Sequence, residues 1–296
     1  MQVHKLLNIH EIREQYNIPT ARFYNYQVGY DNKIYFIMSD NNHKCHYFRI
    51  TYDWEAGKVM DIEKFNFENY PYMSQFWCPY FDYYLLACVC ADYQTKEPNA
   101  YVVDKNGNII QGIYIGHAIA ECTTTPNGRI ITGYLDEGID NEWNRVAEGG
   151  LTIWNDEGRW IWKNKKYDIW YCYAMTLDPC NRLWFYYYGS YNNNYDRKFH
   201  LVFSKKGGDV VFSPDIKGSD GFAVSRDYKK LLIGDGYDDR ASVYRYDIDM
   251  GHKQLLNLQK EVFILADKEI EFYRYMFSRD KVFLHMEDGT IATGEL

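Results

Sequence analysis

The chain has 296 residues and a formal net charge of −8 at pH 7. Its longest basic run, Lys163 to Lys166, is too short to supply the clustered cations that phosphate backbones require, so we expect no nucleic acid partner. The first residues lack the apolar core of a signal peptide, and no segment approaches the roughly 18 apolar residues of a membrane span. We therefore expect a cytoplasmic protein with no membrane partner.

The composition favours β-strands. The chain contains 30 Tyr, 16 Phe and 8 Trp, residues that suit pleated and half-buried surfaces. Its seven cysteines are an odd number and lie mostly in apolar segments, which is typical of buried reduced thiols. The length would accommodate two average domains, but all-β domains of this size are common. We expect a single domain over residues 1–296.

A strand, a short turn and a second strand recur six times along the chain. In the third copy the strands read AIAECTTT and RIITGYL, on either side of a turn that begins at Pro126. The copies occupy residues 24–38, 74–89, 118–135, 171–188, 221–234 and 273–286. Their second strands begin 46 to 53 residues apart, a period typical of β-propeller blades. The sequence therefore predicts an all-β, six-bladed β-propeller with four-stranded blades.

The last copy is too short to form a complete blade. Only 14 residues follow Val282, the first residue of its second strand, which is enough for two strands but not for three. We expect the N-terminal segment, around Val3 to Ile9, to supply the missing strand. This pairing would close the ring and remove exposed sheet edges.

Long polar loops are expected on one face of the ring. The connections between second and third strands share a face with the entrances to the first strands, and here they are long. Loops on one rim of a rigid scaffold are where binding usually resides. The segments 134–144, 187–197 and 234–240 bring carboxylates and tyrosines to this face. The candidate ligand-binding residues of these loops are Asp136, Glu137, Tyr188, Tyr191 and Asp235.

The innermost strands supply a second group of candidates near the axis. Strict alternation in the third copy places His117, Ile119 and Glu121 on one side of the strand. The corresponding positions of the first two copies are Asn25 and Gln75. Because a buried carboxylate needs a partner, we expect these amides or ordered water to contact Glu121.

Glu121 is also the candidate metal ligand. Asp220, directly before the fifth copy, adds a further carboxylate. Oxygen ligands of this kind suit a hard cation such as calcium, which takes six to eight of them, better than zinc. The interpretation that we favour is that no cofactor binds and that the polar groups near the axis bond to each other and to water, with calcium as the alternative.

Four segments resemble those of uncharacterised bacterial six-bladed propeller proteins. They are YLDEGI from Tyr134, GGLTIWNDEG from Gly149, YCYAMTLDPCNRLWFYYY from Tyr171 and LLIGDGYDDR from Leu231. The resemblance covers roughly residues 116–249 and ends at the Asn-rich run YNNNYDRKFH, where this chain departs from the family pattern. It implies the propeller fold and a bacterial source, and it implies no activity.

Three classes of function remain open. We favour a protein that binds an unknown small molecule or protein on the acidic, tyrosine-rich loop face, because this needs only the loops. A calcium-dependent, lactonase-like hydrolase would need a ring of axial ligands, for which Glu121, Asn25, Gln75, Asp220 and His117 are the candidates. A carbohydrate-binding propeller would stack sugars on the tyrosines of YYYGSYNNNY, residues 186–195, but these loops differ between copies.

Overall fold

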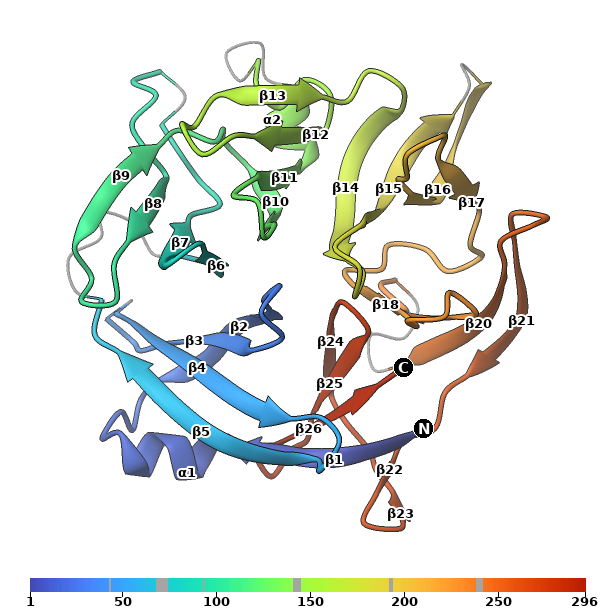
Figure 1. Cartoon of the computed structure of the whole chain (residues 1–296). Helices are drawn as coiled ribbons and strands as arrows, with labels where there is room; N and C mark the ends of the chain where they lie inside the picture. Colours follow the sequence, from blue (N-terminus) through green and yellow to red (C-terminus); the bar gives the residue numbers. More distant parts are fainter. Residues whose placement is uncertain (43, 68–73, 93, 141–144, 192–193, 238–241) are drawn as a thin grey trace.

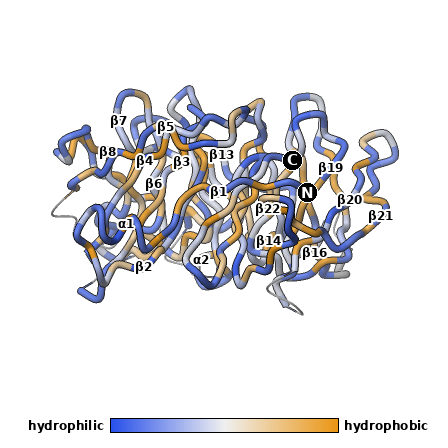
Figure 2. Tube along the Cα trace, turned by 90° about the horizontal axis from the view of Figure 1, so that it is seen from below, coloured by the Kyte–Doolittle hydropathy of each residue, from blue (hydrophilic) through white to orange (hydrophobic). Residues whose placement is uncertain are grey.

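In the described residues, six sheets of mainly antiparallel strands surround a central axis, which confirms the all-β, six-bladed propeller that the sequence predicts (Figure 1). The computed structural model describes residues 1–42, 44–67, 74–92, 94–140, 145–191, 194–237 and 242–296. Seen from the side, the ring is a flat disc with many hydrophilic loops at its two faces (Figure 2). The first strand of each blade lies next to the axis (Figure 1).

Five blades each take their four strands from one continuous segment of the chain. From the axis outward, blade 1 contains β2 (Arg22–Val28), β3 (Ile34–Ser39), β4 (Cys45–Asp53) and β5 (Lys58–Phe65). Blade 2 contains β6 (Phe76–Tyr80), β7 (Tyr83–Ala87), β8 (Ala100–Val103) and β9 (Ile109–Ile113). Blade 3 contains β10 (Ile119–Thr124), β11 (Ile130–Tyr134), β12 (Leu151–Trp154) and β13 (Trp160–Lys163). Blade 4 contains β14 (Asp168–Leu177), β15 (Leu183–Tyr191), β16 (Asn194–Phe203) and β17 (Val210–Phe212). Blade 5 contains β18 (Phe222–Val224), β19 (Lys230–Gly234), β20 (Val243–Asp249) and β21 (Gln254–Lys260).

Blade 6 joins the two ends of the chain. Its inner strands are β24 (Arg274–Ser278), β25 (Lys281–His285) and β26 (Thr290–Glu295), and β1 (Gln2–Asn8) pairs antiparallel with β26. The predicted closure by the N-terminal strand is confirmed, although Ile9 already belongs to a helix. A short hairpin that the sequence did not predict, β22 (Ile264–Leu265) and β23 (Lys268–Glu269), extends this sheet through a parallel pairing of β22 with β1.

In the part of the chain that the structure describes, two short helices interrupt the strands. Helix α1 (Ile9–Gln15) leads from β1 into blade 1, and the Asn8 side chain caps it by accepting a 2.8 Å hydrogen bond from the His10 amide. Ile9 and Ile12 of this helix are buried in the core between blades 6 and 1. Helix α2 (Asp136–Ile139) follows β11 on the loop face.

Short hairpin turns are fixed by side chains at their first residue. The Asn155 Oδ1 accepts hydrogen bonds from the backbone amides of Glu157, at 3.2 Å, and Arg159, at 2.8 Å. Gly158 in this turn has a φ of 75°, a left-handed conformation that glycine adopts without a steric penalty. Asp178 caps the turn between β14 and β15 in the same way.

A separate hydrophobic core lies between each pair of neighbouring blades. Between blades 1 and 2, the indole of Trp77 meets the rings of Tyr35, Tyr47 and Phe65 edge-on, with ring centres 5.0 to 5.6 Å apart. Edge-to-face packing of this kind is a favourable arrangement of aromatic rings. The six interfaces between blades therefore account for much of the aromatic content of the chain.

Candidate functional site

A cavity of about 460 Å³ lies on the axis of the ring, within the range of roughly 300 to 1,000 Å³ for small-molecule sites. Apart from Val89, which follows β7, its lining residues belong to the first strands of the blades or to the residues just before or after them. Its polar or charged lining residues include Asn25, Gln27, Gln75, Glu121, Thr123, Thr176, Asp220, Arg274, Ser278 and Arg279. Four of the candidates from the sequence, Asn25, Gln75, Glu121 and Asp220, therefore come together here.

Glu121 reaches the cavity because β10 is irregular. The register of β10 against β11 shifts between Ile119 and Glu121. Ile119 packs into the core between blades 2 and 3, while Glu121 lines the cavity. The expectation that these two residues share one side of the strand is wrong, because a bulge breaks the alternation. Burial raises the pKa of the Glu121 carboxyl well above its ordinary value of 4.5, and the nearby Asp220 carboxylate raises it further.

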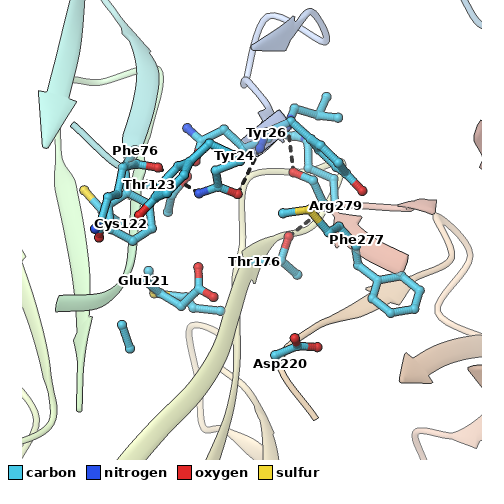
Figure 3. A pocket seen from close by; sticks show the side chains of 18 of the residues that line it. Tyr24, Tyr26, Phe76, Glu121, Cys122, Thr123, Thr176, Asp220, Phe277 and Arg279 are labelled. Atoms are coloured by element: carbon cyan, nitrogen blue, oxygen red, sulfur yellow. Dashed lines mark hydrogen bonds between the residues drawn. The ribbon is translucent and has the colours of Figure 1, made fainter. Parts of the chain in front are cut away.

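Asp220 and Arg274 supply the other charges near the loop end of the cavity. Asp220 lies just before β18, and its carboxyl group and that of Glu121 both project into the cavity (Figure 3). Arg274 begins β24, which lies across the axis from β10 (Figure 1). Sequence reasoning did not single out Arg274, and the neighbouring Tyr273 is exposed and does not line the cavity. The sequence did offer one signal, namely an arginine at the start of an innermost strand.

The side-chain amides of Asn25 and Gln75 have interaction partners other than Glu121. The Asn25 Nδ2 donates to the Gln75 carbonyl at 2.8 Å, which ties blade 1 to blade 2, and its Oδ1 accepts from the Tyr26 amide at 2.9 Å. The Gln75 side chain bonds with Tyr24. The expected contacts from Asn25 and Gln75 to Glu121 are therefore wrong. Within the described residues, no hydrogen bond or ion pair reaches the side chain of Glu121.

Arg279 spans the opposite end of the channel. Its guanidinium donates to the Asp178 carbonyl at 2.9 Å and to the Asn181 Oδ1 at 3.1 Å, and its backbone amide donates to the Thr176 hydroxyl at 2.7 Å. Arg279 belongs to blade 6, while its three partners belong to blade 4. Because blades 4 and 6 are not neighbours, these bonds cross the end of the channel away from the loop face.

The loop candidates lie outside the cavity lining. The His117 Nδ1 lies 2.7 Å from the carbonyl oxygen of Ala91, which fixes the entrance to β10 against blade 2. Asp136 and Glu137 are exposed at the start of α2. The Asp235 carboxylate accepts a 3.2 Å hydrogen bond from the backbone amide of a residue in its own loop, Tyr237.

The two candidate tyrosines of blade 4 pack against other rings. The Tyr188 ring lies 5.1 Å from that of Phe199, and the Tyr191 ring lies 5.8 Å from that of Tyr167. Neither lines the cavity. Parts of the three loops that the sequence places on one face, residues 141–144, 192–193 and 238–240, lie outside the described residues.

Three tyrosines that sequence reasoning did not single out as a group meet near Asp136. The Tyr171 and Tyr173 rings of β14 lie 4.1 Å apart, and the Tyr173 hydroxyl lies 2.5 Å from that of Tyr237. Burial raises the pKa of Tyr171, and the Asp136 and Glu121 carboxylates add to this shift. Tyr237 follows β19 and Asp136 follows β11, so these parts of two predicted loops lie on the same face, beside the same strand.

The residues near the axis do not form a cage for a metal ion. Within the ranges that the structure describes, no three His, Cys, Asp or Glu side chains are grouped so that they could hold a metal ion. Glu121 and Asp220 are the carboxyl groups of the cavity lining, whereas calcium takes six to eight oxygen ligands. The cavity therefore does not fit the calcium site that the sequence suggested.

These features define the class of the protein, a six-bladed β-propeller with a cavity on its axis. No family model matches the chain, and a search of curated protein sequences finds no match. Among solved structures, it is similar to hydrazine synthase of Kuenenia stuttgartiensis, with 9% identity, a TM-score of 0.51 and coverage of 92% of this chain and 95% of that chain. It is also similar to a functionally unknown protein from Desulfotomaculum acetoxidans, with 11% identity, a TM-score of 0.50 and coverage of 93% and 82%.

A third similar structure is virginiamycin B lyase from Staphylococcus aureus, with 14% identity, a TM-score of 0.48 and coverage of 98% of both chains. At such low identities, the similarities to the first two structures show the fold alone. In the part of the chain that the structure describes, neither helix has the length and apolar character needed to cross a membrane.

Proposed function

We propose that the protein binds a small polar molecule in the axial cavity. Two charged side chains of the cavity lining, Glu121 and Arg274, support this proposal. Among the described residues the side chain of neither makes a hydrogen bond or an ion pair, although their backbones pair in the sheets. Polar groups shielded from bulk water normally have partners, and the half-buried carboxyl of Glu121 has none among the described residues. Arg274 is exposed to solvent, so its guanidinium is available to a molecule in the same cavity. A ligand that contacts both side chains would supply the partner that Glu121 lacks.

The ligand enters from the acidic, tyrosine-rich loop face. Two features support this direction. Asp136, Tyr173 and Tyr237 gather on this face beside blade 4, where an aromatic and acidic surface suits the capture of a polar molecule. At the other end, the hydrogen bonds of Arg279 to blade 4 cross the channel.

The alternatives have less support. The calcium-dependent hydrolase lacks ligands, as described above. The carbohydrate-binding alternative rests on residues 186–195, where Tyr186 and Tyr187 are buried and do not offer a stacking surface. The resemblance over residues 116–249 supports a place among uncharacterised bacterial propeller proteins.

A thermal-shift screen tests the proposal. The full chain is screened against a library of polar metabolites, each at millimolar concentration, because a ligand that binds only the folded state raises the Tm. We expect at least one compound to raise the Tm of the parent protein and to lose this effect in Glu121→Gln. The control is Glu157→Gln, which makes the same change at an exposed carboxylate on the outer rim and is expected to keep the response. A response that is equal in all three proteins would contradict axial binding.

A further inference from the structure

The axial cavity carries opposite charges on opposite sides. Glu121 comes from blade 3 and Arg274 from blade 6, and their strands β10 and β24 face each other across the axis (Figure 1). Both residues lie in the first half of their strands, which is the end near the loop face. The cavity between them therefore presents an acidic wall and a basic wall to the same bound molecule.

The acidic wall contains two carboxyl groups. Figure 3 shows the Glu121 and Asp220 side chains projecting into the cavity. Their mutual repulsion, together with burial, disfavours ionisation of Glu121. An ammonium group placed between the two would relieve this repulsion and would form charge-assisted hydrogen bonds with both. A ligand that is only an anion would be repelled by the ionised carboxyl groups of this wall.

The basic wall selects against a ligand that is only a cation. Arg274 presents a permanently charged guanidinium, whose planar fork matches a carboxylate group. Within the described ranges it has no ion pair, so its charge is not neutralised by the protein at this position. A ligand with a carboxylate on this side and an ammonium group on the other satisfies both walls.

We propose that the cavity recognises a zwitterionic small molecule of the amino-acid type, with its ammonium group between Glu121 and Asp220 and its carboxylate at Arg274. This inference rests on the proposed function, since it names the class of ligand for the same cavity. The cavity volume of about 460 Å³ leaves room for a side chain or a second residue.

Binding of such a ligand is coupled to loss of a proton. In the free protein the raised pKa keeps the Glu121 carboxyl largely protonated at pH values where an exposed glutamate is ionised. An ammonium ligand favours the ionised form, so binding should release a proton and strengthen as the pH rises through the Glu121 pKa. The other titratable or charged groups that face Glu121 are Asp220, Cys78, Cys122, Cys172, Tyr171 and, across the cavity, Arg274.

Isothermal titration calorimetry on the full chain tests the inference. The probes are the twenty standard L-amino acids, and each one that binds is compared with its amide and with the corresponding acid that lacks the amino group. We expect each analogue to bind at least about tenfold more weakly, since it loses one charge-assisted contact. Titration in two buffers of different ionisation enthalpy is expected to show proton release with the parent protein and none with Glu121→Gln.

Two variants and two matched controls assign the effect to the cavity. We expect Glu121→Gln and Arg274→Met each to weaken amino-acid binding at least about tenfold, and Glu157→Gln and Arg159→Met to leave it unchanged. The control residues form an exposed ion pair, 3.1 Å apart, on the outer rim. Melting curves without ligand verify that each variant is folded.

The outcomes separate this inference from the proposed function. If no amino acid binds, or if an analogue that lacks one charge binds as well as its parent, the zwitterionic ligand is ruled out. If other polar molecules still bind and respond to Glu121→Gln, the proposed function stands without it. If no compound of either set binds, both proposals fail.

Discussion

The surroundings of the Glu121 carboxyl group are unfavourable for its ionised form. Glu121 lies half-buried in an innermost strand that lines the cavity, and the nearby carboxyl group of Asp220 disfavours its ionised form. A group of this kind costs stability whenever it is ionised without a cation nearby. Binding sites often retain such groups because their partner is the ligand.

The pH dependence of stability tests this view of Glu121. Its pKa in the folded state is raised above the ordinary value of 4.5, so the folded protein binds the proton more tightly than the unfolded chain does. Below pH 4.5 both states are protonated and Glu121 costs nothing. As the pH rises toward the folded-state pKa, stability is progressively lost. We therefore expect the Tm of ligand-free Glu121→Gln to equal that of the parent at pH 4 and to exceed it increasingly up to pH 8.

The control for this experiment is Glu157→Gln, whose side chain is exposed and paired with Arg159. Its Tm difference from the parent should stay small across the same range. A Glu121→Gln variant that is less stable than the parent at every pH would mean that the carboxylate makes a favourable contact within the protein.

Strand β1 closes the ring by pairing with β26. Leu6 of this strand is buried in the core between blades 6 and 1, whereas the adjacent Lys5 is half exposed and pairs with Glu11 at 3.1 Å. These neighbours allow a matched comparison. We expect Leu6→Ala to lower the free energy of unfolding by about 3 kcal/mol, because it leaves a cavity in the core. We expect Lys5→Ala to cost about 1 kcal/mol or less, since exposed ion pairs contribute little.

Chemical denaturation monitored by tryptophan fluorescence measures both values. Loss of β1 pairing would also expose the edge of β26, so Leu6→Ala should aggregate at a lower temperature than Lys5→Ala. Equal costs for the two variants would show that β1 is not part of the cooperative unit.

Elements also show where sequence reasoning fails. Alternation correctly indicated strands, but it gave the wrong orientation in β10, because the register shifts between Ile119 and Glu121. A bulge changes which side chains face the axis without leaving a distinctive sequence pattern. Arg274 was missed for a different reason, since β24 pairs with β25 without a register shift and an arginine is most often an exposed surface residue. The side chains of the cavity were therefore harder to predict than the strands that carry them.

At the scale of the molecule, the fold was predictable because it is repetitive. Six copies of one hairpin at a spacing near 50 residues leave few alternatives to a ring, and the short last copy requires a strand from the other end of the chain. The site is not repetitive. Glu121, Asp220 and Arg274 occupy different places in three blades, and only the closed ring brings them to one cavity.

A crystal structure of the complex would show directly whether the axial cavity is a binding site. Crystals would be grown with the compound that gives the largest rise in Tm in the screens. We predict electron density for this compound on the axis, within hydrogen-bonding distance of Glu121 and Arg274 and on the loop-face side of Arg279. Density for the compound elsewhere, on the outer edge of a blade or on the face opposite the loops, with an empty axis, would contradict the account.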